Sequence, residues 1–327
     1  AAMVGISGAA VVAMGTIALP SMLERGYDKK MALGVINTGG GWGILIPPSI
    51  LMILYALITG VSVGKMFAAG IMPGILLMVL TAIYILVRCH LQPELAPALP
   101  KEERGTWPEK LRALRAVLLP IGVVIMVLGS IIGGITTPTE AAAMGVLGAL
   151  ISAAVYRQFK WSILQEAAIR TFKLTGMIMW ILFAAHAFSA AYQSMGAQDL
   201  IEGLMNMIPG GPWGIIVAMM VIVFLLAMVL DPVGIMLITL PVFMPIVESL
   251  GFDPIWFGIL FVINMEIGYM TPPFGFNLFY LKGVVPPSIT MKDIYSSIIP
   301  FVIVEIVGLG LIMIFPQIAT YLPDLLF

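Results

Sequence analysis

Long apolar segments dominate this sequence. Uninterrupted ones of about 20 residues have the length that a helix needs to cross the hydrocarbon core of a bilayer. They run over residues 66–87, 116–135, 139–156, 174–193 and 297–316. This pattern predicts five plain membrane-spanning helices in an all-α polytopic membrane protein.

Further apolar segments are interrupted by residues that bend or break helices. They are 1–22, which bends at Ser7-Gly8; 30–59, which contains glycines and Pro47-Pro48; 213–249, which turns at Asp231-Pro232; and 254–281, which contains Pro272-Pro273. Proline removes a backbone donor and ends or kinks a helix. We therefore expect two re-entrant hairpins, 1–22 and 213–249, each followed by a broken helix.

Polar sequence is confined to short stretches and one longer loop, 88–115. Its proline-containing part, 91–109, is expected to be a solvated linker. Segments 159–172 and 288–296 are amphipathic, with Lys or Arg on one face, which predicts helices lying along the inner membrane surface.

The distribution of charge fixes a predicted orientation. With loop 88–115 in the cytoplasm, only Lys65 of the 16 Lys and Arg residues falls outside, as the positive-inside rule requires. The chain is 61% hydrophobic and 10% charged, with a mean hydropathy of +1.08, so it needs membrane lipid as its solvent. The formal net charge of -1 gives no indication of a nucleic-acid partner.

The two broken segments correspond to each other at an offset of 225 positions. Gly43, Pro47 and Pro48 align with Gly268, Pro272 and Pro273, so the spacing Gly-x-x-x-Pro-Pro occurs in both. By the predicted orientation the first segment runs outward and the second inward. Inverted repeats with hairpins and broken helices are typical of secondary transporters whose site lies near the bilayer midplane.

The prolines remove the helical partners of four carbonyl groups, those of Gly43, Ile44, Gly268 and Tyr269. In hydrocarbon such groups are tolerated only where protein, water or an ion satisfies them. Two interpretations follow: structural kinks relieved by nearby Ser and Thr, or cation sites completed by hydroxyls. Candidate hydroxyls are Thr271 in the second half and Ser7 or Thr38 in the first. Half-helices starting near Ser49 and Phe274 would also direct positive dipole ends at an anion.

Several motifs together resemble one transporter family. They are LERGYDKKMALGVINTGGGWGILIPPS (23–49), GGITTPTEAAAMGVLGAL (133–150), LDPVGIMLITLPVFMPIV (230–247) and GYMTPPFGFNLF (268–279). Over essentially its whole length the chain resembles the large membrane subunit of tripartite ATP-independent periplasmic (TRAP) transporters.

This resemblance implies an elevator mechanism in the bacterial inner membrane, driven by sodium ions. It implies two protein partners, a small membrane subunit and a periplasmic solute-binding protein that delivers an organic acid anion, often a dicarboxylate or a sialic acid. The family normally has further scaffold helices before residue 1. The implied division is a transport domain from 1–60 and 201–283, scaffold and connecting helices in 61–200, and an interfacial helix with the last span in 284–327.

The resemblance also assigns candidate site residues. The first sodium site would involve Ser7, Gly39, Gly40 and Gly43, and the second Asp231, Gly268 and Thr271. Candidate substrate-binding residues are Pro47, Pro48, Pro272, Pro273 and Asn277. For Asp231, which precedes a proline at a helix start, a helix cap is the plainer interpretation.

Two intramembrane acids have no assigned role in this scheme. Glu266 lies beside the second break and Glu305 lies inside the last span. Such acids are functional candidates by default, although Glu305 would equally suit a neutral side chain hydrogen-bonded to a neighbouring helix.

Other functions compete with sodium-coupled uptake. A sodium/proton or anion exchanger would share the inverted-hairpin layout. An intramembrane enzyme is disfavoured, because the two histidines, His90 and His186, form no His-Glu-x-x-His motif. A passive channel is disfavoured because matched hairpins occlude a pathway rather than line a pore.

Overall fold

The structure is a computed structural model that describes residue 5, residues 7–98, 106–196 and 203, and residues 208–327. All regular structure in these ranges is helical. The predicted all-α class is confirmed, whereas the first arm of the predicted hairpin 1–22 falls largely outside the described residues.

The helices follow the predicted segments closely. Their bounds are α1 Ser7–Glu24, α2 Lys29–Gly41, α3 Ile50–Thr59, α4 Val63–Leu91, α5 Trp107–Ile132, α6 Pro138–Val155, α7 Trp161–Ser194, α9 Gly211–Ala227, α10 Pro232–Ser249, α11 Pro254–Tyr269, α12 Phe276–Lys282, α13 Met291–Ile314 and α14 Gln317–Leu326, with short 3-10 turns at η1 Trp42–Ile44 and η2 Pro93–Leu95.

Polar side chains at the helix starts explain several of these bounds. Asp28 accepts a hydrogen bond from the backbone N–H of Met31 at 2.8 Å and so begins α2. Thr137 and Glu140 form a reciprocal capping box at the start of α6, with Pro138 in the first turn, where its missing N–H costs nothing.

Six helices in the described part of the chain are long and apolar enough to cross a membrane: α1, α4, α6, the Trp161–Ala184 part of α7, α10 and α13. The predicted spans 66–87, 139–156 and 297–316 fall on α4, α6 and α13. The apolar core of the span predicted at 116–135 is shorter, Leu118–Ile132 within α5.

The two predicted surface helices are wrong as separate elements. Segment 159–172 continues without a break into the next span, so that α7 runs from Trp161 to Ser194. Segment 288–296 contributes the first turns of α13, which begins at a capping box between Thr290 and Asp293. The junctions contain no proline or glycine that would end a helix, so the hydrogen-bond ladder continues.

The polar loop is also shorter than predicted. Helix α4 extends to Leu91 and α5 begins at Trp107, so helices take up both ends of the predicted loop 88–115. Pro108 lies in the first turn of α5, a position where proline is tolerated.

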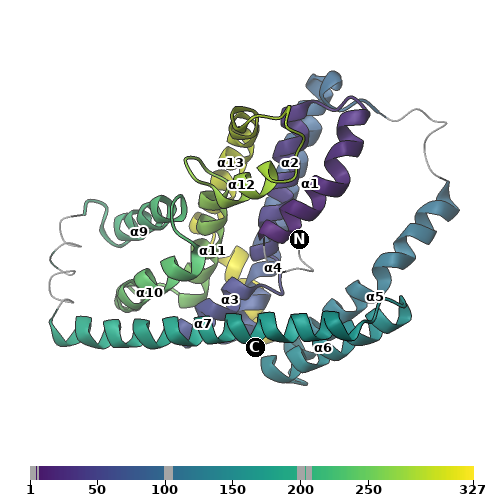
Figure 1. Ribbon diagram of the computed structural model, residues 1–327. Helices are drawn as coiled ribbons and strands as arrows, with labels where there is room; N and C mark the ends of the chain where they lie inside the picture. The colour runs from purple at the N-terminus through teal and green to yellow at the C-terminus, as the bar shows by residue number, and fades with distance from the viewer. Residues whose placement is uncertain (1–4, 6, 99–105, 197–202, 204–207) are drawn as a thin grey trace.

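Helix α11 lies at the centre of the packed helices. Every residue from Trp256 to Gly268 is buried, and α11 contacts α2, α3, α4, α9, α10, α12, α13 and α14. Helices α5 and α6 pack along each other, and α7 contacts α10. Helices α5, α6 and α7 lie at the outside of this group (Figure 1). Their exposed apolar side chains, such as Phe172 and Trp180, are suited to lipid or to another membrane protein.

Glycine allows two of the packed helices to approach closely. A Cβ placed on Gly34 of α2 would collide with the ring of Phe301 and lie 2.8 Å from the backbone oxygen of Ser297, both on α13. The backbone oxygen cannot move aside as a flexible side chain can. The contact between α2 and α13 therefore depends on the absence of a side chain at Gly34.

We predict that Gly34→Ala destabilises the protein by about 1–3 kcal/mol, the usual cost of overpacking a well-packed interior. The matched control is Gly310→Ala on α13, because a Cβ there meets no atom within 4 Å. Thermal unfolding of the detergent-solubilised protein measures both. An equal melting-temperature change in the two variants would contradict the close α2–α13 contact.

Candidate functional site

The first helix break lies between α2 and α3. Three glycines, Gly39–Gly41, weaken the end of α2, a single 3-10 turn follows, and Pro47 and Pro48 prevent a helix from resuming before Ile50. Ser49 begins α3 by accepting a hydrogen bond from the N–H of Met52 at 3.3 Å. The result is a non-helical segment of about one helical turn inside an apolar region.

The second break lies between α11 and α12. Helix α11 ends at Tyr269, and Gly275, with φ of +49°, forms the turn into α12. The hydroxyl of Thr271 donates to the carbonyl of Ile267 at 2.6 Å. The Pro47-Pro48 and Pro272-Pro273 peptide bonds are both cis, so the two breaks share this feature as well as their spacing.

Two of the four carbonyl groups predicted to lack partners are satisfied within the chain. The hydroxyl of Ser49 donates to the carbonyl of Ile44. The N–H of Thr271 donates to the carbonyl of Gly268 at 3.1 Å. Sequence reasoning considered only the helical partner four residues later, and the broken backbone uses a side chain and a tighter turn instead.

The two breaks lie against each other. A Cβ placed on Gly41, the last residue of α2, would lie 2.8 Å from Oε1 of Glu266 and 3.2 Å from the sulfur of Met270. Met270 directly follows α11, where the second break begins. Segments 225 positions apart in the sequence therefore meet at one place in the core.

The start of the chain reaches the same place. A Cβ on Gly5 would lie 2.9 Å from the carbonyl oxygen of Pro48, and one on Gly8 would lie 2.6 Å from the ring of Tyr280 on α12. Ser7 lies between these two glycines and is buried. The structure thus brings Ser7 between the first break and the helix that follows the second.

The glycines of the predicted first sodium site differ in their surroundings. Gly40 packs so closely on Val11 of α1 that a side chain would collide with it. A Cβ on Gly39 would meet no atom within 4 Å, and Gly43 is buried in the 3-10 turn. There is thus open space beside Gly39, whereas Gly40 serves the packing of α1 on α2.

Asp231 has the role of a helix cap. Its carboxylate accepts hydrogen bonds from the N–H groups of Val233 at 3.0 Å and Gly234 at 3.2 Å, and its side chain is exposed. The preceding helix, α9, ends beside the second break, where Ala227 contacts Gly268. The helix cap was the plainer interpretation of Asp231 from sequence, and the geometry confirms it.

Several polar side chains near the breaks are buried without a partner. In the described part of the chain, Ser7 Oγ, Thr38 Oγ1 and both amide atoms of Asn277 form no hydrogen bond. Asn277 lies in the first turn of α12 and is fully buried. Buried polar groups in proteins are nearly always paired, so these atoms form a polar region beside the breaks in an otherwise apolar core.

The candidate prolines vary in exposure. Pro47 is buried and Pro48 half-buried, whereas Pro272 is half-buried and Pro273 exposed. The carbonyl of Pro273 accepts a hydrogen bond from the hydroxyl of Tyr295 at 3.0 Å. The prolines would contribute to a site through the shape and polarity of the broken backbone, because a proline residue offers only its carbonyl as a hydrogen-bonding group.

Sequence reasoning missed two features of this region. Asn37, next to Thr38, is fully buried and both of its amide atoms lack a partner. Glu305 accepts a hydrogen bond from the indole N–H of Trp42 at 3.0 Å, which joins the last span to the first break. A buried amide beside three glycines was visible in the sequence, but the Trp42–Glu305 pairing was not.

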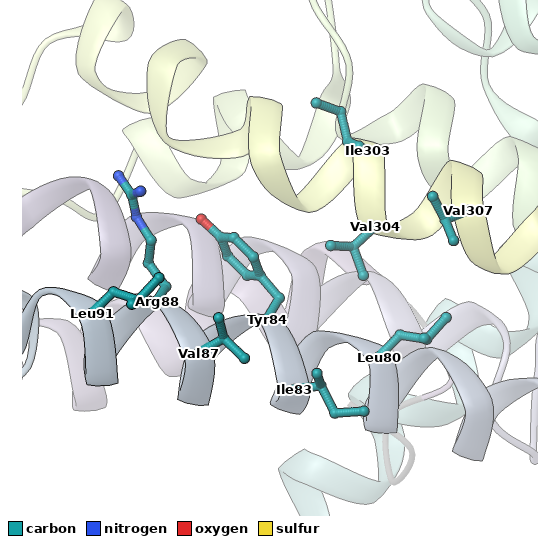
Figure 2. A pocket seen from close by; sticks show the side chains of 9 residues that line it. All are labelled: Leu80, Ile83, Tyr84, Val87, Arg88, Leu91, Ile303, Val304 and Val307. Atoms are coloured by element: carbon teal, nitrogen blue, oxygen red, sulfur yellow. The ribbon is translucent and has the colours of Figure 1, made fainter.

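A surface groove between α4 and α13 has a different character. It has a volume of about 450 Å³ and is lined by apolar side chains of both helices, with Tyr84 and, at one end, Arg88 (Figure 2). None of the candidate site residues lines it. It lacks the convergent polar groups that a small polar solute requires.

Comparisons with known proteins show the family to which the chain belongs. The family described as "Tripartite ATP-independent periplasmic transporter, DctM component" matches residues 1–318. The ectoine TRAP transporter large permease protein of Halomonas elongata is 35% identical, with 99% of this chain and 74% of the relative covered. The C4-dicarboxylate TRAP transporter large permease protein of Pseudomonas aeruginosa gives the same identity and coverage. The sialic acid TRAP transporter permease protein of Haemophilus influenzae is 28% identical, with 98% of this chain and 52% of the relative covered.

These relatives are transport proteins rather than enzymes, and the long apolar helices of this chain fit a multi-pass protein of the bacterial inner membrane. The chain belongs to the DctM family, the large membrane subunits of tripartite ATP-independent periplasmic transporters.

Proposed function

We propose that this chain is the membrane subunit of a sodium-coupled secondary transporter that imports an organic acid anion. In this proposal a periplasmic solute-binding protein delivers the anion, and a small membrane subunit completes the transporter. The observation that carries the proposal is the meeting of the two helix breaks around buried polar atoms that have no partner in the described part of the chain.

The chemistry of the available ligands suits sodium. Carbonyl and hydroxyl oxygens are hard ligands, which hard cations prefer over nitrogen or sulfur. The described residues contain no cluster of three His, Cys, Asp or Glu, so a cation here would rely on backbone and hydroxyl oxygens. The proposed first site comprises Ser7, Gly39, Gly40 and Gly43, and the second comprises Gly268, Thr271 and the Asp231 turn.

The proposed anion site lies between the two breaks. Helix α3 starts there and directs its first N–H groups, with the positive end of its dipole, at the non-helical segment. The amide of Asn277 offers two donors and an acceptor. Neither break contains Lys or Arg, so bound sodium would supply much of the countercharge. The proposed substrate-contacting residues are Pro47, Pro48, Pro272, Pro273 and Asn277.

The relatives indicate the substrate class. Their names specify ectoine, C4-dicarboxylates and sialic acid. All these solutes carry a carboxylate, although they differ in size and in their other groups. We infer that this chain handles a carboxylate of similar size, such as a dicarboxylate or a sialic acid.

An inverted-repeat elevator is the mechanism that we propose. Gly41 and Glu266 occupy equivalent positions under the offset of 225, and they touch each other. Equivalent positions of two repeats meet only near the axis that relates the repeats, so this contact supports a pseudo-symmetric arrangement. The moving part would contain 1–60 and 201–283, and the helices of 61–200 would supply the scaffold. In this proposal the last span, whose helix α13 packs closely on α2, moves with the breaks.

A proton-coupled or sodium/proton exchanger is the second candidate. The buried carboxyl groups of Glu266 and Glu305 are the observation that favours it. The two candidates differ in which cation gradient drives accumulation of the solute.

We predict that the intact transporter, reconstituted in liposomes with its binding protein, accumulates the anion only when external sodium is present. If about two sodium ions accompany a monovalent anion, each net charge gains about 2.3 kcal/mol per 100 mV, so an inside-negative potential should accelerate uptake. Radiolabelled uptake with choline in place of sodium provides the measurement. Accumulation driven by a pH gradient without sodium would support the exchanger instead.

We predict that Thr271→Ala raises the half-saturating sodium concentration about three- to tenfold. The variant loses one oxygen ligand of the ion, which we take to contribute about as much binding free energy as a hydrogen bond, about 1 kcal/mol. Thr271→Ser, which keeps the hydroxyl, should remain near the wild type. Thr59→Ala is the matched control, because Thr59 is also half-buried and donates to the carbonyl four residues earlier, at 2.8 Å. A sodium titration unchanged in Thr271→Ala would remove this residue from the site.

We predict that Asn277→Ala raises the half-saturating substrate concentration about two- to tenfold, because one substrate hydrogen bond contributes about 0.5–1.5 kcal/mol. Asn264→Ala is the control, since the amide of Asn264 is buried but already donates to the carbonyl of Met220. That control should lower thermal stability without changing the apparent substrate affinity. Equal affinity losses in the two variants would refute a substrate contact at Asn277.

A further inference from the structure

The groove between the spans α4 and α13 is a second candidate site, and none of the proposed sodium or substrate residues lines it. Its volume is about 450 Å³, and Figure 2 shows side chains of the two helices facing each other across it. Both helices are long and apolar enough to cross a bilayer. The walls are apolar and largely open, with Val87 53%, Ile303 56% and Val307 52% exposed. Open apolar walls inside a membrane suit an apolar occupant, such as a lipid acyl chain.

The groove has about the length of one membrane leaflet. Its α4 wall runs from Leu80 to Leu91, a rise of about 16 Å along the helix. The hydrocarbon core of a bilayer is about 30 Å thick, so one leaflet contributes about 15 Å. Helix α4 ends at Leu91 and the polar residues Gln92 and Glu94 follow, which places this end of the groove at the membrane surface. By the predicted orientation this is the cytoplasmic surface, so the groove spans the inner leaflet.

A cationic side chain stands at the surface end of the groove. Arg88 lines the groove there and is exposed, whereas the other lining residues are apolar apart from Tyr84 (Figure 2). The ion pairs found among the described residues do not include Arg88. A guanidinium group binds a phosphate through two parallel hydrogen bonds. A basic residue at the cytoplasmic end of a groove between spans therefore suits the phosphate of an anionic lipid.

Tyr84 adds a second polar group at the same end. It lies one helical turn before Arg88 and therefore on the same face of α4. Its ring packs edge-on against Phe301 of α13, with the ring centroids 5.1 Å apart. This contact holds the ring between the two helices, and Figure 2 shows the hydroxyl directed toward the Arg88 end of the groove. The hydroxyl can donate a hydrogen bond to an oxygen of a lipid headgroup that lies on Arg88.

The walls fit an acyl chain better than a helix of a partner subunit. Contacts between membrane helices are enriched in small residues, which let two backbones approach. The described residues that line the groove include no Gly, Ala, Ser or Thr. By contrast, Gly308 of α13 packs directly on Leu77 of α4, where these two helices meet. A helix is about 10–12 Å wide, so a single turn of it takes up about 400–600 Å³, as much as the whole groove offers.

We propose that this groove binds one anionic phospholipid of the cytoplasmic leaflet. The phosphate lies on Arg88, and one acyl chain follows the apolar walls toward Leu80 and Val307. The chain packs against both helices, so the bound lipid stabilises the contact between α4 and α13. The inference rests on this groove and on the predicted orientation, and it is independent of the sodium and substrate sites proposed above.

The first test is native mass spectrometry of the intact transporter, purified in mild detergent and titrated with phosphatidylglycerol. Arg88→Gln should weaken binding of the first lipid about fivefold or more, the usual contribution of one basic residue near an anionic lipid. Arg157→Gln is the matched control, because Arg157 is also exposed, follows α6 on the same predicted side of the membrane and lies outside the groove. Equal losses in the two variants would overturn the contact at Arg88.

A filled groove provides a second pair of variants. Val307→Trp places a large side chain inside the groove, whereas Ile306 lies outside it at the neighbouring position and is similarly exposed, at 49%. Val307→Trp should lose the bound lipid and Ile306→Trp should keep it, and melting temperatures without added lipid check that both are folded. Lipid binding that is the same in both variants and in the wild type, as expected if another helix covers the groove, would overturn the proposal.

Three additions to the delipidated wild type separate the chemical requirements of the site. Phosphatidylglycerol should raise the melting temperature most, phosphatidylcholine, whose headgroup has no net charge, should raise it less, and inorganic phosphate should leave it unchanged. Equal effects of the two lipids would overturn the preference for an anionic headgroup. An equal effect of inorganic phosphate would overturn the acyl-chain site. These outcomes are separate from sodium-dependent uptake, which tests the proposed function.

Discussion

The structure depends on one constraint: a backbone group inside a membrane must find its partner within the protein. An unbroken helix meets this requirement by itself, and a broken one does not. The breaks at Pro47-Pro48 and Pro272-Pro273 therefore need a protein environment, and the chain provides it by placing the ends of α2 and α11 against each other. The burial of α11 from Trp256 to Gly268 follows from the same need, because this helix carries one break and supports the other.

Glycine makes this arrangement sterically possible. Gly41 leaves room for Glu266 and Met270, Gly40 lets α1 approach α2, and Gly268 lets the end of α9 approach the second break. Each glycine costs about 0.5–1 kcal/mol of helix stability relative to alanine. In this core that cost is offset by helix contacts that no larger residue would permit. The glycine-rich stretch thus has two roles, ending α2 and bringing the halves of the chain together.

The sequence predicted those features that depend on local chemistry. Apolar length located the spans, and proline located the breaks, because both effects act within one or two turns. Amphipathic pattern failed at 159–172 and 288–296, since a charged face is equally compatible with a surface helix and with the first turns of a span. Sequence also could not pair Trp42 with Glu305 or Gly41 with Glu266, because these contacts join segments more than 200 residues apart. The sodium and substrate assignments rest on family resemblance and remain predictions.

The unpartnered atoms connect this architecture to transport. In the described part of the chain, side-chain atoms of Asn37, Thr38 and Asn277 are buried and form no hydrogen bond, and an unpaired buried polar group costs about 1–3 kcal/mol. In the proposed function, a ligand that bonds to these atoms would gain binding energy from doing so. The end of α2 at Gly41 lies against Glu266 and Met270, so the two breaks share one contact. In the proposed mechanism, ion and solute would stabilise the same arrangement of the two breaks, and coupling would arise from the packing of α2 on α11 rather than from direct contact between the two ligands.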